Sequence, residues 1–109
     1  MSDTSDPLEV VDNQADHQFE VKLDGKTAFA EYRLVAGGII LPHTEVPEAF
    51  EGKGVASRLA RFAMQYARDH ELKVIPLCPF MAAYMKKHAE THDLVHPTYR
   101  DRIGLPPLA

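Results

Sequence analysis

The sequence predicts one mixed α/β domain, in which three antiparallel strands precede a strand-helix-strand unit and a final short helix. Two observations support this prediction: apolar residues alternate with polar ones in the N-terminal half, and an amphipathic stretch follows later in the chain. The protein has 109 residues, of which 45% are hydrophobic and 26% are charged. Such a composition is typical of a single globular domain with a small core.

The strand pattern begins after residue 17. Apolar and polar residues alternate over residues 19–23, and the Asp-Gly pair at 24–25 is typical of a hairpin turn. The pattern continues as a second strand over residues 27–35, and after two glycines a third strand runs over residues 39–46. Consecutive strands joined by short turns favour an antiparallel meander.

The pattern changes to a helical one in the second half. Residues 54–69 carry apolar side chains at spacings of three and four, which predicts an amphipathic helix of about four turns. Residues 73–78 then indicate a buried fourth strand, and residues 80–88 indicate a second, short helix. A strand, a helix and a further strand predict a parallel pair with a right-handed crossover.

Charge is unevenly distributed along the chain. The first 16 residues carry five acidic residues and no lysine or arginine, so residues 1–16 are predicted to be a disordered acidic tail. The folded domain is expected over residues 17–97, and residues 98–109 are expected to be a C-terminal tail. Without the leader, 11 acidic residues stand against 12 basic ones, so no nucleic-acid surface is predicted.

The compartment is predicted from three absences in the sequence. No apolar run approaches the roughly 18 residues of a membrane span, and the N-terminus lacks the basic-then-apolar order of a signal peptide. Cys78 is the single cysteine, which excludes an internal disulfide. We therefore expect a cytoplasmic protein that is a monomer or a weak homodimer and does not contact a membrane.

The most informative stretch is Glu51-Gly52-Lys53-Gly54-Val55-Ala56, directly before the predicted helix. Glycines let a backbone turn sharply and approach a ligand closely. The unpaired amides and the dipole at a helix start favour an anion, above all a phosphate. The chain lacks the P-loop pattern of Gly, four free positions, Gly-Lys and then Ser or Thr. The dinucleotide-binding fingerprint would need a glycine where Ser57 stands.

These residues resemble the acyl-coenzyme A signature of the GNAT N-acetyltransferase superfamily. Its pattern is Gln or Arg, two free positions, Gly, one free position, then Gly or Ala. Gly54 and Ala56 match it, whereas Glu51 replaces the first residue and is expected to turn outward. The blocks at 43–47 and 74–80 also resemble a subfamily of GNAT proteins of about one hundred residues. The resemblance covers residues 17–97 and implies a GNAT-like mixed sheet whose parallel strands splay apart as a V.

The resemblance also implies how the cofactor, acetyl-coenzyme A, would be held. Pantetheine would pair like an extra strand with backbone groups of Glu45 and Val46. The pyrophosphate would rest on the loop, and a positive charge at its rim and another at the adenosine end would assist. The residues expected to contact pyrophosphate and adenosine are Gly52, Lys53, Gly54, Val55, Ala56 and Lys87.

Three residues are candidates for acetyl-transfer chemistry. Tyr84 resembles the tyrosine that protonates the departing thiolate in many GNAT enzymes. Cys78, expected at a strand end, would take the acetyl group or act as the acid, and His43 would serve as the base for the amine. Each has a structural alternative: the cysteine and tyrosine as core residues, and the histidine as a partnered strand residue.

The resemblance implies acetyl transfer to an amine acceptor that the sequence leaves unnamed. A non-catalytic acyl-coenzyme A binding module and a structural partner protein with an exposed sheet edge remain alternatives. The spacing of His88, His92 and His96 suits a metal only on a continuous helix. Because Pro97 disfavours helical geometry at His96, no metal site is expected.

Overall fold

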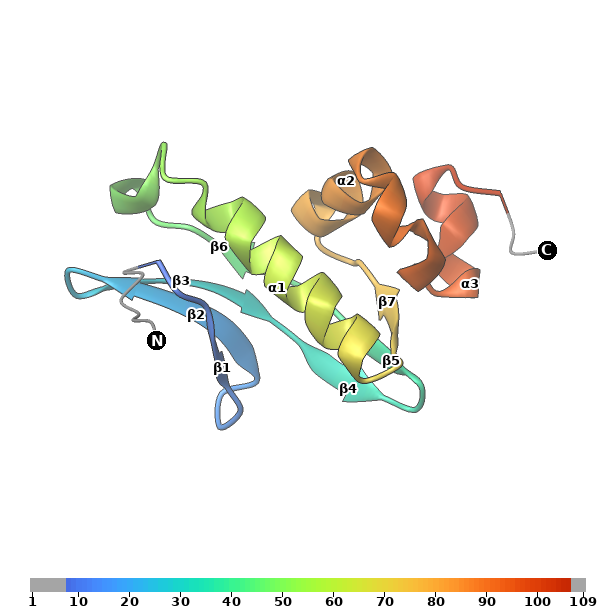
Figure 1. Ribbon diagram of the computed structural model, residues 1–109, viewed down its shortest axis with the longest axis horizontal. Coiled ribbons are helices and arrows are strands. Elements are labelled where there is room, and N and C mark those ends of the chain that lie inside the picture. Colours follow the sequence, from blue (N-terminus) through green and yellow to red (C-terminus); the bar gives the residue numbers. More distant parts are fainter. Residues whose placement is uncertain (1–7, 107–109) are drawn as a thin grey trace.

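The computed structural model describes residues 8–106, and their strands divide between two small sheets. The first sheet has the order β1-β2-β3-β6, and the second has the order β4-β5-β7. Helix α1 packs against strands of both sheets and lies across them in Figure 1. The strands are β1 (Val11–Asn13), β2 (Gln18–Leu23), β3 (Lys26–Glu31), β4 (Arg33–Val35), β5 (Gly38–Ile40), β6 (Thr44–Glu45) and β7 (Lys73–Ile75).

The hairpin of β2 and β3 forms the centre of the first sheet. Leu23 pairs with Lys26, so the turn contains Asp24 and Gly25, and both adopt positive φ angles as the sequence predicts. On one face of the hairpin the side chains are completely buried against α1, and the opposite face is more polar, as the alternation predicts. The buried residues are Phe19, Val21, Ala28 and Ala30.

The predicted second strand, residues 27–35, is in fact two strands that belong to different sheets. The backbone N–H of Tyr32 donates a hydrogen bond of 2.9 Å to the carbonyl of His17, and beyond this point β2 offers no further partner. The chain continues as β4, which pairs instead with β5. Tyr32 is held at the change of sheet because its ring stacks on Phe19 at 4.5 Å and its hydroxyl donates to Asp12 at 2.7 Å.

The predicted third strand, residues 39–46, also changes sheets. Leu41 donates to the carbonyl of Ile75 in the second sheet at 3.0 Å, whereas the carbonyl of His43 accepts from Glu31 in the first sheet at 2.8 Å. Pro42 lies between them and has no N–H with which to continue a ladder. The chain is therefore β5 on one side of this proline and β6 on the other.

The parallel pair is confirmed. Strand β7 pairs in parallel with β5, with Gly38 opposite Lys73 and Ile40 opposite Ile75. The connecting helix α1 (Val55–Asp69) begins one residue later than predicted and ends at the predicted residue. Its buried face is the apolar one: Val55, Leu59, Ala60, Ala63, Met64 and Ala67.

The C-terminal segment is more ordered than the sequence indicates. Helix α2 (Pro79–Lys87) is followed by η2 (Ala89–Leu94), α3 (Pro97–Arg100) and η3 (Asp101–Ile103). Ile103 is buried, and the guanidinium of Arg100 donates to the carbonyls of His92 and Pro106. The prediction of a loose tail over residues 98–109 is therefore wrong as far as residue 103, and residues 107–109 lie outside the described part.

The N-terminal boundary also differs from the prediction. Strand β1 falls inside the predicted tail of residues 1–16 and pairs antiparallel with β2, with Val11 opposite Glu20. Its Asp12 accepts the hydrogen bond from Tyr32. Residues 1–7 of the predicted tail lie outside the described residues. None of the helices within residues 8–106 is long and apolar enough to cross a membrane.

Candidate active site

The glycine loop ends in an uncapped helix start. Gly52 and Gly54 adopt positive φ angles of 79° and 69°, which side-chain-bearing residues rarely adopt, and Gly54 is the N-cap residue of α1. Among the residues that the structure describes, no side chain caps this end, and its first turn carries no acidic residue. A Cβ atom added at either glycine would meet no atom of residues 8–106 within 4 Å. The helix start is therefore open to an anion.

The loop amides do not all have the same freedom. The N–H of Lys53 donates to the carbonyl of Phe50 at 3.1 Å, in the turn that follows the 3-10 helix η1 (Glu48–Phe50). This amide therefore already has an acceptor. By contrast, the first amides of a helix, here those of Val55 and Ala56, have no acceptor within the helix. These amides are the ones best placed to receive an anion. The side chains of Lys53 and Glu51 are exposed, the latter as expected from its outward turn.

The chain segments that follow β5 and β7 separate after Leu41, and the region between β6 and the start of α2 is called the gap. The last backbone contact between the two chain segments is the hydrogen bond from Cys78 N–H to the carbonyl of Leu41, at 2.9 Å. Beyond it, Thr44 pairs with Ala30 of β3, and β6 is the last strand of its sheet in the described part of the chain. Because the carbonyl of His43 bonds Glu31 of β3, the backbone groups of Glu45, two residues on, also point to β3. The backbone groups of Thr44 and Val46 point to the outer edge of β6, which is free to pair with an extended ligand.

Cys78 does not end a strand, because β7 stops at Ile75 and the cysteine is the N-cap residue of α2. Its side chain is only 5% exposed. The thiol donates a hydrogen bond of 3.5 Å to the hydroxyl of Thr44 across the gap. Thr44 was not predicted as a site residue from the sequence. It lies between two predicted site residues, His43 and Glu45, and this position was the only indication that the sequence offered.

His43 lies on the other face of β6. Side chains alternate along a strand, so Thr44 points toward Cys78 while His43 and Glu45 point away from it. Nε2 of His43 lies 3.2 Å from a carboxylate oxygen of Glu45, and the His43 side chain is 52% exposed. The structure thus brings Cys78 to Thr44 and places His43 on the opposite face of β6.

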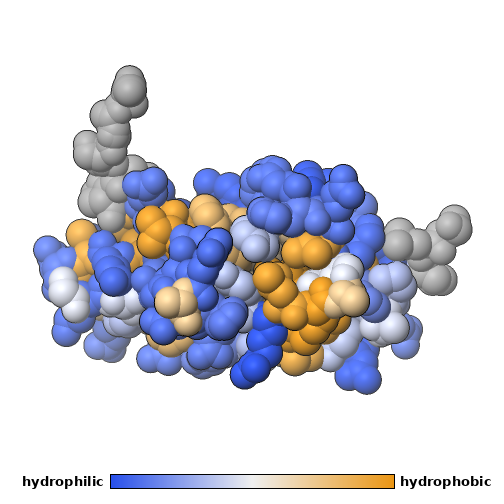
Figure 2. Space-filling view, turned by 90° about the horizontal axis from the view of Figure 1, so that it is seen from below, coloured by the Kyte–Doolittle hydropathy of each residue, from blue (hydrophilic) through white to orange (hydrophobic). Residues whose placement is uncertain are grey.

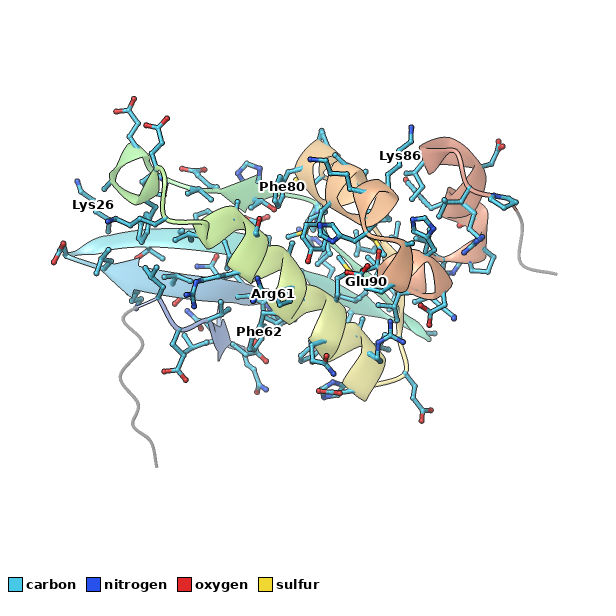
Figure 3. The ribbon with its side chains drawn as sticks, turned by 45° about the horizontal axis from the view of Figure 1, so that its top comes forward. Lys26, Arg61, Phe62, Phe80, Lys86 and Glu90 are labelled. Carbon is cyan, nitrogen blue, oxygen red and sulfur yellow. The ribbon has the colours of Figure 1, made fainter. Side chains whose placement is uncertain are left out.

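Tyr84 lies half-buried on α2, six residues beyond Cys78. Its ring stacks on that of His88 with the centroids 4.0 Å apart, and Nδ1 of His88 lies 3.2 Å from a carboxylate oxygen of Glu90. The pKa of Glu90 is lowered by a hydrogen bond from its own backbone N–H and by His88. Figure 3 shows Phe80 on the first turn of α2, toward β6, and Glu90 on the segment after the helix.

Two features from the sequence remain to be placed: Lys87, predicted to contact adenosine, and the three histidines whose spacing was considered for a metal. Lys87 is exposed in the last turn of α2, at the opposite end from Cys78 and about 13.5 Å along the helix axis. His96 is extended and donates its N–H to the carbonyl of Val74. Within residues 8–106 no group of three or more histidine, cysteine or acidic side chains could hold a metal ion.

The features now described define a GNAT-like fold: a parallel pair, β5 and β7, whose first strand leads into β6 of the other sheet, with a glycine loop at the start of the helix that joins the pair. The chain belongs to the GCN5-related N-acetyltransferase family, which matches residues 18–94. The predicted superfamily and fold are thereby confirmed.

Three comparisons give the degree of similarity. Protein NATD1 of Gallus gallus is 33% identical over 93 residues, which cover 83% of this chain and 84% of that protein. Protein NATD1 of Homo sapiens is 34% identical over 85 residues, which cover 75% of each chain. The NMR solution structure of a GCN5-like protein from Staphylococcus aureus has a TM-score of 0.67 at 27% identity, covering 84% of this chain and 91% of that one.

Proposed function

We propose that this protein transfers an acetyl group from acetyl-coenzyme A to a primary amine. The observation that carries the proposal is the uncapped start of α1 at Gly54, beside the free edge of β6. An extended pantetheine arm needs a strand edge for its amides, and a pyrophosphate needs a cluster of free N–H groups. The two features lie in this order along the chain, and membership of an acetyltransferase family supports the assignment.

The cofactor contacts follow from this arrangement. Backbone groups of Val46 and Thr44 would bind pantetheine, whereas those of Glu45, the other residue predicted for this contact, point to β3. The amides of Gly52, Gly54, Val55 and Ala56 would bind the pyrophosphate. Of the two predicted lysines, Lys53 is nearer to the helix start, because Lys87 lies at the far end of α2. Lys53 would contribute a single positive charge at the rim of the loop.

Acetyl transfer forms a C–N bond and breaks the C–S bond of the thioester. The amine must lose a proton, and the departing thiolate must gain one. We assign the first step to His43, which lies on the more exposed face of β6 with Glu45 beside it. Cys78 and Tyr84 are the candidates for the second step, since both follow β7 at the other side of the gap.

Cys78 also remains a candidate nucleophile. In that case its thiol would lose a proton and take the acetyl group as a new thioester before the amine attacks. The structure favours the role of a donor in the free protein, because the thiol donates to Thr44 and is almost fully buried. The variants Cys78→Ala and Tyr84→Phe separate these roles by their rates.

The test has two stages. Isothermal titration should give saturable binding of acetyl-coenzyme A that inorganic phosphate does not reproduce, and absence of binding would exclude the proposal. Release of free coenzyme A thiol is then followed with benzylamine and with lysine peptides. Binding without release for every amine would favour a non-catalytic acyl-coenzyme A binding module.

A further inference from the structure

A second hollow lies away from the proposed cofactor gap. A cavity of about 470 Å³ is lined by residues of the β1-β2 turn and of β3, β4 and β5, and it contains no residue of the glycine loop or of α2. Its volume is in the range of pockets that bind small molecules. The lining residues are Asp16, His17, Glu31, Tyr32, Arg33, Leu34, Val35 and Ile40.

Strand β4 borders this cavity with an unpaired edge. It is the first strand in the order β4-β5-β7, so within residues 8–106 no strand pairs with its other side. Alternate residues of a strand direct their N–H and C=O groups to the same edge. The N–H of Tyr32 points to that edge, where it bonds His17, and the N–H and C=O of Leu34 therefore point there too.

The same edge carries exposed apolar side chains. Leu34 is 52% exposed and Val35 is 43% exposed, although both belong to a sheet. Figure 2, seen from below, shows an apolar patch under the part of the molecule where Figure 1 places β4. Flat apolar edges with free backbone groups are usually blocked in soluble proteins because they recruit further strands.

Charge favours a cationic occupant. The cavity walls hold two carboxylates, Asp16 and Glu31, against one guanidinium, that of Arg33. The hairpin segment from residue 8 to residue 21 carries four acidic residues and no lysine or arginine. A lysine side chain matches these walls, because its aliphatic stem suits the apolar residues and its ammonium group suits the carboxylates.

We propose that the edge of β4 and the adjacent cavity bind an extended, lysine-containing protein segment as an added strand. Backbone hydrogen bonds to Leu34 would align the segment, and one lysine would enter the cavity. Ile40 of the cavity wall lies four residues before Thr44 at the gap, a span of roughly 13 Å of extended chain. A segment docked here would thus flank an acceptor amine at the gap.

The assignment of this segment to the acceptor rests on the proposed function, whereas the docking itself does not. The first experiment therefore measures binding without acetyl-coenzyme A. The probe is a fluorescein-labelled peptide, Thr-Val-Lys-Val-Thr, and its matched control has glutamate in place of the lysine. We expect fluorescence anisotropy to show at least tenfold tighter binding of the lysine peptide, and equal binding of the two peptides would overturn the proposal.

The variants separate the strand edge from the cavity. Leu34→Pro removes the outward N–H, which β5 does not use, and proline is tolerated on strand edges. It should weaken peptide binding at least tenfold, whereas Leu34→Ala keeps the N–H and should weaken it by only about threefold. Glu31→Gln should reduce the preference for lysine over glutamate, and Asp101→Asn, a remote exposed acid, should leave it unchanged.

Two further measurements keep the outcome decisive. If Leu34→Pro fails to fold, backbone amide shifts of the wild-type protein on peptide addition decide: changes centred on residues 31–35 support the site, and changes elsewhere overturn it. Light scattering tests the alternative occupant, because a dimer that Leu34→Ala or Glu31→Gln abolishes would assign this edge to a second copy and overturn the peptide site. Peptide binding without release of coenzyme A thiol for benzylamine and for every lysine peptide would refute the proposed function alone.

Discussion

The proposed phosphate site at the start of α1 is tested by placing a methyl group on the N-cap residue of this helix. Gly54 has a φ of 69°, and a Cβ atom added there meets no described atom within 4 Å, so Gly54→Ala causes no clash with residues 8–106 in the free protein. Its cost is conformational, about 1–2 kcal/mol for a side-chain-bearing residue in the left-handed region. For a domain of this size, that cost lowers Tm by roughly 4 to 16 °C.

The effect on the cofactor is separate and larger. The new methyl group would stand where a phosphate approaches the helix start, and each charge-assisted hydrogen bond lost there costs about 1.5–3 kcal/mol. Losing one such bond weakens binding of coenzyme A by roughly 10-fold to 150-fold. Isothermal titration of Gly54→Ala against the wild-type protein, well below Tm, measures this loss.

Gly25→Ala is the matched control for Gly54→Ala. Gly25 has a φ of 77° in the β2-β3 turn, with nothing from the described part of the chain within 4 Å of an added Cβ atom, so its conformational cost is similar. Gly25→Ala should therefore lower Tm by a similar amount and leave the affinity for coenzyme A unchanged. If Gly54→Ala binds coenzyme A as tightly as Gly25→Ala does, the anion is not held at the start of α1.

Three further predictions concern stability. Leu59→Ala, at a fully buried position of α1, should cost about 2–5 kcal/mol in chemical unfolding. Burial raises the pKa of Glu20, but hydrogen bonds from neighbouring amide side chains and the charge of Lys22 together lower it by more than burial raises it. The pKa of Glu20 in the folded protein is therefore below the ordinary value. Ionised Glu20 therefore stabilises the fold at pH values above its ordinary pKa, and this stabilisation is lost as the pH falls through the folded-state pKa. Urea unfolding between about pH 6 and pH 3 should show that the free energy of unfolding falls less in Glu20→Gln than in the wild-type protein. The Arg68 guanidinium donates to both oxygens of Asp93 at 3.0 and 3.2 Å on an exposed surface, so Asp93→Asn should cost about 1 kcal/mol or less, and about 1 M salt should remove most of the difference.

The sequence predicted those elements whose pattern is local. The amphipathic stretch at 54–69 corresponds to α1, and the strand that follows it forms the predicted parallel pair. A helix of this length shows its period several times over, and a helix between two strands permits few connections. The turn at Asp24 and Gly25 was equally readable, because its conformation demands particular residues.

The division into two sheets could not be predicted from the alternation of apolar and polar residues. Apolar residues continue through Tyr32, and nothing in the alternation shows that the hydrogen-bond partner changes there. Partners are set by long-range geometry, namely where β2 ends and where β7 arrives. For the same reason the sequence identified Cys78 as a candidate but placed it at the end of a strand instead of at the start of α2.

The ends of the domain were underestimated because their burial depends on single contacts. The segment 98–103 has too few apolar residues for a periodic signal, yet Ile103 is buried and Arg100 bonds two carbonyls. Strand β1 is similarly short, and its acidic residues suggested a tail. One of them, Asp12, instead accepts a hydrogen bond from the hydroxyl of Tyr32, and burial together with this bond raises the pKa of that tyrosine.

Both proposed binding sites arise from the same division of the sheet. The change of partner around Pro42 sends Leu41 to β7 and Thr44 to β3, and this leaves β6 with a free edge at the gap. The change of partner at Tyr32 sends β4 to β5 and leaves its outer edge free beside the cavity. A protein in which β3 and β4 formed one straight strand would have neither edge in its present place. We therefore expect substitutions that straighten the chain at Tyr32 to alter both cofactor binding and peptide binding, whereas Gly54→Ala should alter only the former.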